Sequence, residues 1–338
     1  MKKKSLLNIA EEDLQEELKK LKLPKFVAGQ ILSWIYEKHV LDFSEMTNIS
    51  KSNRALLEDK FRIREFQGFE TVGSDDGLAK KYVFELFDGL KIESVLLTEK
   101  GYNTLCISSQ VGCPAKCRFC ATGYMGFKRN LSALEIISQI LFILKTGEPV
   151  SHVVFMGMGE PLLNLDNVLK SIALINSDKG LNISKRKVTV STCGIIKGIQ
   201  HLIDEKIALN LAFSVGSPDP MKRKIIMPIE AKNSIIEIAR LLKQYLKEHN
   251  RKLTMEYTLI KGKNDSEEEI RELGNLAKYL NAKVNLINLN PSDLIPFEPV
   301  AVEVINKVKK KLSEKKVNVT IRYSKGAEIT AACGQLAS

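Results

Sequence analysis

Apolar residues in the first 62 positions recur three or four residues apart. The positions that follow this spacing are Leu14, Leu18, Leu21, Val27, Ile31 and Trp34. Such spacing gathers apolar side chains on one face of an α-helix. Asn8 followed by Glu11 predicts a capping box at the start of the first helix. Residues 1–62 are therefore predicted to form a small helical module.

Residues 81–97, KYVFELFDGLKIESVLL, alternate between apolar and polar side chains. Alternation with a period of two is typical of a strand with one buried face. Asp88-Gly89 stands in the middle of the segment and favours a tight turn between two strands. The segment is therefore predicted to be a β-hairpin that joins the helical module to the rest of the chain.

Beyond Leu105, short runs rich in β-branched residues alternate with amphipathic stretches. The runs are LCISS, HVVFM, KVTVST, NLAFSV, LTMEYTLI, KVNLINLN and NVTIRY. One amphipathic stretch begins with Ser132 and Glu135, a capping box, and stops at Gly147. Repeated strand–helix units predict a parallel sheet in an α/β fold, and six or seven of them predict a barrel or partial barrel.

Composition adds a charge preference to this picture. Of the 338 residues, 44% are hydrophobic, which is enough for one large domain with a small one. Neither a signal peptide nor a membrane span is expected from the pattern. Lys and Arg number 51 against 40 Asp and Glu, a formal net charge of +11. This excess favours a polyanionic partner such as nucleic acid.

Individual lysine runs have a simpler interpretation than the excess over the whole chain. The run KVKKKLSEKK at 307–316 predicts the solvated face of a helix, because apolar residues at helical spacing mark a buried stripe opposite. The residues of that stripe are Ala301, Ile305, Val308 and Leu312.

The six cysteines are unevenly spaced, so they do not form the pattern of a disulfide framework, and a reducing cytoplasm is the expected setting. Three of them, Cys113, Cys117 and Cys120, crowd into the loop GCPAKCRFCATG. A structural zinc site needs four ligands, and the nearest histidine, His152, lies far along the chain. A 4Fe-4S cluster is normally held by four cysteines, so three leave one iron open to an exogenous chelator.

The spacing CxxxCxxC after the first strand of a partial barrel resembles the radical S-adenosylmethionine (SAM) superfamily, whose open iron is chelated by the amine and carboxylate of SAM. MGMGEP at 156–161 resembles the glycine-rich element of that superfamily, whose backbone binds the methionine amine. Here the glycines permit close approach of the backbone, and Glu160 offers an acceptor. The cysteine loop, MGMGEP, STCG, SVGSP and NLNP all directly follow predicted strands. In barrels of this kind the catalytic residues lie at the carboxyl ends of the strands.

Nearly the whole chain resembles one family within that superfamily, the RlmN-type adenine-2 methyltransferases of 23S rRNA and tRNA, with their relative Cfr. The shared stretches are FVAGQILSWIY, FSEMTNIS, TLCISSQVGCPAKCRFCATG, GFKRNLSALEI, VVFMGMGEPLLN, LNISKRKVTVSTCG, MEYTLIKGKNDS and AACGQL. The resemblance implies a partial (β/α)6 TIM-like barrel over 99–325, with a helical RNA-binding domain at 1–62, a hairpin linker at 63–98 and a tail at 326–338.

The resemblance also implies a mechanism that consumes two SAM molecules, with a 4Fe-4S cluster on Cys113, Cys117 and Cys120. By position, Cys333 matches the cysteine that carries the methyl group. Cys106 matches the cysteine that resolves the protein–RNA adduct by forming a disulfide with Cys333. Glu93 matches the acid–base glutamate, although without the resemblance it reads as a surface carboxylate of the hairpin. The radical route is needed because the ring carbons of adenine are not nucleophilic.

By the same resemblance, SAM is expected to be held by residues after several strands. These are Gly159, Glu160, Ser191, Ser214, Val215, Gly216 and Asn290. The family usually has SLHAP where this chain has SVGSP, so Gly216 replaces a histidine and any role of that side chain is in question. Cys193, in STCG, is interpreted as a small packed residue.

The RNA partner is expected to present a splayed adenine to the barrel mouth. We expect basic residues of the helical module and of FKRN to hold its phosphates, and these are Lys2, Lys3, Lys4, Lys128 and Arg129. A flavodoxin or ferredoxin would supply electrons, and a monomer is expected.

Three alternatives remain open. One is a Cfr-like enzyme that methylates carbon 8 of adenine. Another is a glycyl-radical activase, and the third is a non-catalytic iron–sulfur or zinc RNA-binding protein.

Overall fold

The computed structural model describes residues 3–7 and 9–337, and its centre is a ten-stranded sheet in the order β14-β13-β12-β11-β10-β9-β6-β5-β4-β3. From β14 to β6 every neighbouring pair is parallel. The parallel strands are β6 (Tyr102–Cys106), β9 (His152–Phe155), β10 (Val188–Thr192), β11 (Asn210–Ser214), β12 (Thr254–Leu259), β13 (Lys283–Asn288) and β14 (Val319–Arg322). Their connections contain α5 (Ala133–Lys145), α6 (Leu165–Asn176), α7 (Ile196–Asp204), α9 (Ile235–His249), α10 (Glu267–Leu280) and α11 (Val302–Glu314).

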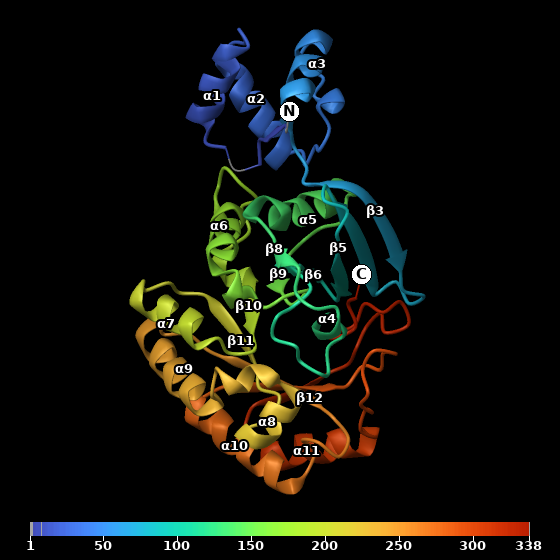
Figure 1. Cartoon of the computed structure of the whole chain (residues 1–338), viewed down its shortest axis with the longest axis vertical. Helices are drawn as coiled ribbons and strands as arrows, with labels where there is room; N and C mark the ends of the chain where they lie inside the picture. Colours follow the sequence, from blue (N-terminus) through green and yellow to red (C-terminus); the bar gives the residue numbers. More distant parts are fainter. Residues whose placement is uncertain (1–2, 8, 338) are drawn as a thin grey trace.

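The order of strands is that of an open barrel with six strand–helix crossovers and a seventh strand at its end (Figure 1). All seven predicted runs form strands, and the predicted partial barrel is confirmed. Two short helices, α4 (Ala121–Tyr124) and α8 (Pro220–Ile226), lie in loops outside this pattern.

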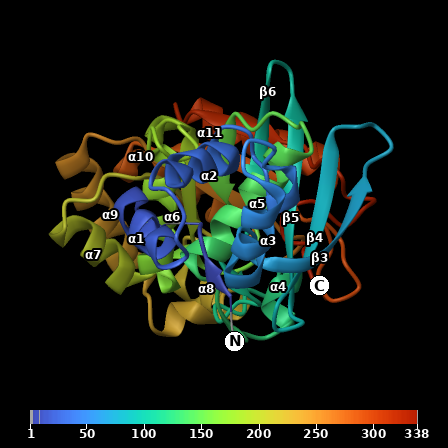
Figure 2. The same ribbon diagram turned by 90° about the horizontal axis from the view of Figure 1, so that it is seen from above.

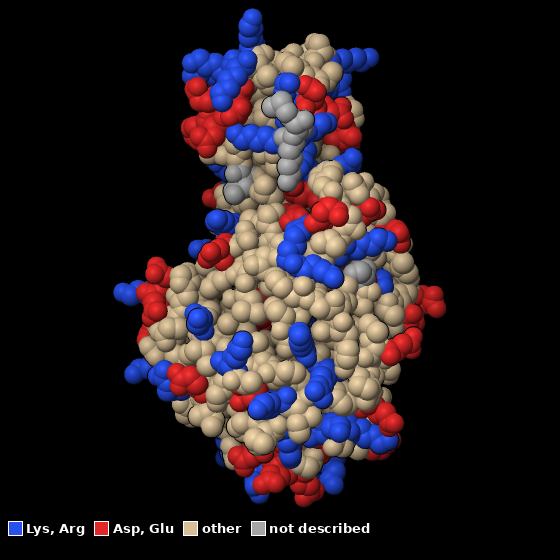
Figure 3. Space-filling model, viewed as in Figure 1, with Lys and Arg blue, Asp and Glu red and all other residues tan. Residues whose placement is uncertain are grey.

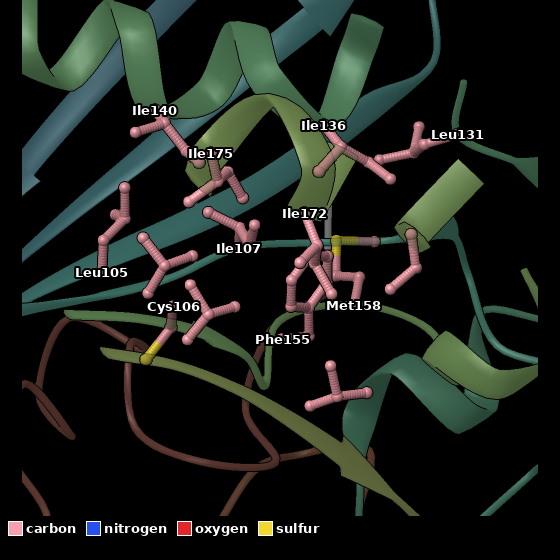
Figure 4. Packing of buried hydrophobic residues seen from close by; sticks show 14 of the residues in the cluster. Leu105, Cys106, Ile107, Leu131, Ile136, Ile140, Phe155, Met158, Ile172 and Ile175 are labelled. Carbon is pink, nitrogen blue, oxygen red and sulfur yellow. The ribbon is translucent and has the colours of Figure 1, made fainter. Parts of the chain in front are cut away.

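Helix α5 begins where the sequence predicts. The Ser132 side chain accepts from the backbone N–H of Glu135, and the Glu135 carboxylate accepts in return from the backbone N–H of Ser132. Its apolar face packs between β6 and α6, as Figure 4 shows for Ile136 and Ile140. In the same view the side chains of Leu105 and Ile107 point toward α5, and the sulfur of Cys106 points away from that helix. Strand alternation thus places Cys106 on the inner side of the barrel.

The predicted hairpin is present and is longer than expected. Strands β4 (Ala79–Leu86) and β5 (Lys91–Glu99) are antiparallel and joined by a turn in which Gly89 has φ +78°. A further strand, β3 (Phe66–Gly73), pairs with β4. Because β5 also pairs with β6, the hairpin continues the barrel sheet. The boundaries at 62, 98 and 325 stay a prediction.

The N-terminal module contains α1 (Glu11–Lys20), α2 (Phe26–Tyr36) and α3 (Lys51–Lys60) and lies beyond α5 at one end of the molecule (Figures 1 and 2). A short parallel pair, β1 (Lys4–Ser5) with β2 (Phe61–Arg62), joins the first and last residues of this module. The sequence did not predict this pair. Ala10 precedes α1 and makes no side-chain cap, and the expected cap residue Asn8 lies outside the described residues.

One detail of the predicted stripe on α11 is wrong. Ile305, Val308 and Leu312 are buried as expected, whereas Ala301 is exposed. The helix begins at Val302, so Ala301 occupies the cap position and lies beyond the packed face. Across the described ranges, the helices are all too short or too polar to span a bilayer.

Arg223 on α8 has 0% of its side chain exposed and ties together loops at the carboxyl ends of the strands. Its guanidinium donates to the carbonyls of Val215 (2.8 Å) and Cys193 (2.5 Å) and pairs with the Glu230 carboxylate. A buried charge with this many partners is stable only while all of them are in place.

We expect Arg223→Ala to lower the free energy of unfolding by about 3–5 kcal/mol, because it leaves the Glu230 carboxylate buried without its cation. Lys224→Ala, on the exposed side of the same helix, is the matched control and should change it by less than about 0.5 kcal/mol. Urea denaturation of the metal-free chain measures both. A loss below about 1 kcal/mol for Arg223→Ala would contradict the expected role.

Candidate active site

Inward-facing side chains of the parallel strands line two cavities that lie one after the other along the barrel. The larger, of about 670 Å³, is lined by residues near the amino ends of the strands, such as Thr104, Thr189 and Thr254. The smaller, of about 160 Å³, is lined by the cysteine loop and by residues near the carboxyl ends. Both cavities are bordered by Met156, Glu256, Ile287, Arg322 and Cys333. These five residues form the wall between the cavities.

The cysteine loop surrounds one end of the smaller cavity. Cys113, Cys117 and Cys120 all line it. The loop is tightly folded, since a Cβ added at Gly112 would stand 1.6 Å from the Gly126 carbonyl oxygen. Only glycine permits such an approach, and Gly112 also has φ +70°.

The chemistry of these thiols fits a cluster better than a single ion. Within the described part of the chain, no three His, Cys, Asp or Glu side chains lie close enough together to bind one metal ion. A cluster instead takes one cysteine at each of several irons, so its ligands stand farther apart. Burial raises the pKa of Cys113 to about 12, and burial beside the neighbouring thiols raises that of Cys117 well above its usual range. A coordinated metal is what deprotonates thiols in such a setting.

The backbone of the element MGMGEP packs against Gln110, which comes just before the cysteine loop. Gly159 has φ +103°, and a Cβ there would stand 2.6 Å from the Cβ of Gln110. The two carboxylate oxygens of Glu160 accept from the backbone N–H groups of Leu162 (3.0 Å) and Cys193 (2.8 Å). Glu160 is therefore occupied in fixing the loops, while it and Gly159 line the smaller cavity.

The other expected SAM contacts divide into two groups. Ser191 and Ser214 line the smaller cavity together with the three cysteines. Val215, Gly216 and Asn290 line neither cavity. Gly216 has φ +70°, and a Cβ there would stand 2.2 Å from the sulfur of Met227. A side chain at this position thus meets both backbone strain and an occupied space.

The C-terminal tail enters the barrel and is fixed there by backbone hydrogen bonds. The Ala121 N–H donates to the Gly334 carbonyl (2.7 Å), and Asn290 Nδ2 donates to the Cys333 carbonyl (2.9 Å). Thr122 Oγ1 also donates to the carbonyl of Leu336 (2.7 Å). Asn290 therefore positions the tail, and Cys333 lies in the wall between the two cavities.

Cys106 and Glu93 approach from the neighbouring strands. Cys106 pairs with Val95 across β5 and β6, and both line the larger cavity. Val95, Leu97 and Glu99 alternate into this cavity, so Glu93, two residues before Val95, faces the same side. Glu93 is only 3% exposed, and its interpretation as a surface carboxylate is wrong. Burial raises the pKa of Cys106 to about 12. Cys193 is buried, as expected for a packed residue.

Sequence analysis missed two charged residues in the wall between the cavities. Glu256 on β12 accepts from Asn285 Nδ2 (2.9 Å) and lies 3.7 Å from the guanidinium of Arg322 on β14. The positive charge of Arg322 partly counters the effect of burial, which raises the pKa of the Cys333 thiol. An acidic residue inside the apolar run LTMEYTLI and a basic one inside NVTIRY were the available signals.

Comparison with known proteins agrees with this geometry. The family model of the radical SAM superfamily matches residues 107–274, and that of the ribosomal RNA large subunit methyltransferase N-terminal domain matches residues 4–63. The crystal structure of a radical SAM methyltransferase from Sphaerobacter thermophilus is 36% identical, superposes with a TM-score of 0.93, and covers 98% of this chain and 99% of its own. The fold and the cysteine loop thus define an enzyme of the radical SAM class.

Two relatives carry the description "probable dual-specificity RNA methyltransferase RlmN". The protein of Pseudothermotoga lettingae is 47% identical over 98% of this chain and 97% of its own length. That of Thermotoga neapolitana is 43% identical over the same shares. The chain therefore belongs to the RlmN family, and its membership of the radical SAM superfamily implies a 4Fe-4S cluster and SAM.

We expect Gly216→Ala to lower the free energy of unfolding by about 3 kcal/mol, from a strained φ and from contact with Met227. Gly262→Ala is the matched control, since its φ is +67° and nothing lies within 4 Å of an added Cβ. It should cost about 1 kcal/mol. Chemical denaturation measures both, and equal losses would show that Met227 moves aside freely.

Proposed function

We propose that this protein methylates carbon 2 of an adenosine in 23S rRNA, and of tRNA as well, by carrying the methyl group on Cys333. The position of Cys333 supports this proposal most strongly, because Cys333 borders both cavities. A residue that receives a methyl group from SAM on one side and delivers it to RNA on the other needs this position. The name of the relatives, dual-specificity RNA methyltransferase, supports the RNA substrate.

In the first half of the reaction, the Cys333 sulfur attacks the methyl carbon of SAM, and S-adenosylhomocysteine leaves. Only the thiolate is nucleophilic, so the nearby guanidinium of Arg322 assists by favouring the charged form. Gly159, Ser191 and Ser214 would hold SAM in the smaller cavity. When bound on Cys113, Cys117 and Cys120, the cluster supplies the electron that cleaves a second SAM and so generates the radical that activates the methyl group.

In the second half, the adenine would lie in the larger cavity. Its carbon 2 would accept the activated methyl carbon of Cys333, which would join RNA and protein covalently, and the unpaired electron of this adduct would return to the oxidised cluster. Glu93 faces this cavity and would take the proton from carbon 2. The Cys106 thiolate would then attack the Cys333 sulfur. The S–S bond forms, the bond between the Cys333 sulfur and the methylene carbon breaks, and this carbon takes up a proton to become the methyl group of the released RNA. All six cysteines are free thiols in the structure, and this is the state from which the disulfide step would begin.

The basic residues at the amino ends of the strands fit the entry of RNA. Lys187 and Lys283 are exposed and line the larger cavity at this end. Arg322 and Lys325 also line the cavity, but they lie at the carboxyl end of β14 and pair with Glu256 and Glu99. Two residues expected to bind RNA have acidic partners instead: Arg129 pairs with Asp88 and Glu135, and Lys4 pairs with Glu17. The expected contribution of Lys2 lies outside the described residues.

Methylation at carbon 8 is the second candidate, since it requires the same cysteines. The stretch PLLN after GMGE favours carbon 2. A binding protein without catalysis would not need Cys106 and Cys333 at one cavity.

The test is anaerobic incubation of the reconstituted protein with reductant, methyl-labelled SAM and an unmodified 23S rRNA fragment, followed by mass spectrometry of the nucleosides. We expect 2-methyladenosine, a complete loss with Cys333→Ala, and a covalent protein–RNA adduct that accumulates with Cys106→Ala. Cys193→Ala is the control thiol and should retain methylation. 8-Methyladenosine would contradict the assigned position, and RNA binding without any cleavage of SAM would contradict catalysis.

For RNA entry, we expect Lys187→Ala combined with Lys283→Ala to weaken RNA binding and to reduce the slope of log affinity against log salt by about 1 for each phosphate that the variant no longer binds. Lys247→Ala with Lys309→Ala, exposed on α9 and α11, serves as the matched control and should leave the slope unchanged. Filter binding at several salt concentrations measures both pairs. Identical slopes would argue against entry at this end of the barrel.

A further inference from the structure

The cysteine loop and α8 form an exposed surface outside the smaller cavity, which we call the loop–α8 face. It combines apolar and basic side chains. Four large apolar residues are exposed there: Tyr124 (43%), Phe127 (44%), Met221 (75%) and Ile225 (53%). Four exposed basic residues surround them: Lys116, Arg118, Lys128 and Lys224.

The two parts of this face are joined by direct contacts. The Arg118 N–H donates to the Ile226 carbonyl (2.9 Å), which fixes α8 against the loop. The Tyr124 hydroxyl donates to the Arg118 carbonyl (3.0 Å). Helix α8 buries Arg223 and Ile226, so its other residues face outward. Figures 1 and 2 show α4 and α8 on the same side of the molecule.

This face has more exposed basic than acidic side chains, and the carboxylates beside it already accept hydrogen bonds or form ion pairs. Asp219 caps α8 by accepting from the N–H groups of Met221 and Lys222. Glu230 and Glu269 are buried and pair with Arg223 and Lys222. Over the residues that the structure describes, Lys116, Arg118, Lys128 and Lys224 form no salt bridge. Figure 3 shows Lys and Arg side chains spread over the middle of this side, with most Asp and Glu toward its edges.

We propose that the loop–α8 face docks a small acidic one-electron carrier protein. The inference rests on the proposed function in one respect: each turnover needs an electron delivered to the metal group held by Cys113, Cys117 and Cys120. Electron transfer slows steeply with distance, so the donor must bind at the end of the barrel that carries these cysteines. An apolar centre with a charged rim is suited to a weak redox complex, in which electrostatic complementarity sets the encounter rate.

The proposed complex transfers a single electron between the two proteins. One electron leaves the carrier, which is oxidised by one unit, and enters the group held by the three thiols, which is reduced by one unit. No bond between the two proteins is formed and no proton needs to cross the interface.

RNA is the rival occupant of a basic surface, and the structure favours the carrier here. The adenine must reach Cys106, which lines the larger cavity, and Glu93, which lies on the side of β5 that faces this cavity. That cavity opens at the opposite ends of the strands, where Lys187 and Lys283 lie. Aliphatic side chains such as Met221 and Ile225 also contribute little to binding RNA, which is held by charge and by stacking on aromatic rings.

The experiment compares Lys224→Glu in the full chain with the control Lys247→Glu. A bacterial flavodoxin is the probe. Its Kd is measured by calorimetry at low and high salt, and cluster reduction is followed by absorbance with either flavodoxin hydroquinone or dithionite. RNA affinity is measured in parallel. A second variant, Met221→Ser with Ile225→Ser, tests the apolar centre without a change of charge.

We expect the charge reversal to weaken flavodoxin binding and to slow reduction by flavodoxin about tenfold or more at low salt, with both effects shrinking at high salt. Reduction by dithionite and RNA affinity should stay within about twofold, and the control should resemble the unmodified chain. Unchanged flavodoxin binding in both variants would overturn the proposal. A selective loss of RNA affinity would assign the face to RNA instead. Should RNA methylation fail in the unmodified chain while flavodoxin binding remains sensitive to the face, the docking surface stands without the proposed function.

Discussion

The structure of the site depends on hydrogen bonds between the C-terminal tail and the cysteine loop. The Ala121 N–H and the Thr122 hydroxyl, both directly after Cys120, donate to tail carbonyls. The tail has little apolar surface of its own, so its position follows from these contacts and from Asn290. Folding of the loop and placement of Cys333 are therefore coupled. A loop disordered by loss of its metal would also release Cys333, the residue proposed to carry the methyl group.

The parallel strands of the open sheet line one cavity toward each of their two ends. Strand alternation sends every second side chain inward, and the carboxyl halves of the strands contribute to one cavity while the amino halves contribute to the other. The wall between the cavities contains an ion pair between Glu256, whose side chain is 8% exposed, and Arg322, whose side chain is 45% exposed. A half-exposed pair adds little to stability, but it places a positive charge beside the Cys333 thiol. Under the proposed mechanism, this separation assigns radical generation and RNA binding to different ends of one barrel.

Sequence patterns predicted the elements whose cause is local. The capping box at Ser132, the turn at Gly89 and the alternating strands depend on residues within a few positions of one another, and all are confirmed. What could not be predicted depends on distant partners. The pairing of β1 with β2 joins positions nearly sixty residues apart. The burial of Glu93 arises because β5 joins the barrel sheet. The pairing of Glu256 with Arg322 joins β12 to β14 across the intervening β13, so it depends on the order of three strands from separate stretches of the chain.

The departure at Gly216 has a physical explanation in α8. Met227 follows this helix directly, and its sulfur fills the space that a side chain at Gly216 would need. Arg223 holds the same helix inward through the Val215 and Cys193 carbonyls, so Met227 cannot easily withdraw. The Gly216 carbonyl is in turn fixed by Asn264 Nδ2 at 2.7 Å. The loop after β11 is thus held by its neighbours on both sides, and its shape is kept without the histidine that the family resemblance leads one to expect here. One short helix therefore braces the loop inside the barrel and presents Met221 and Ile225 outside it.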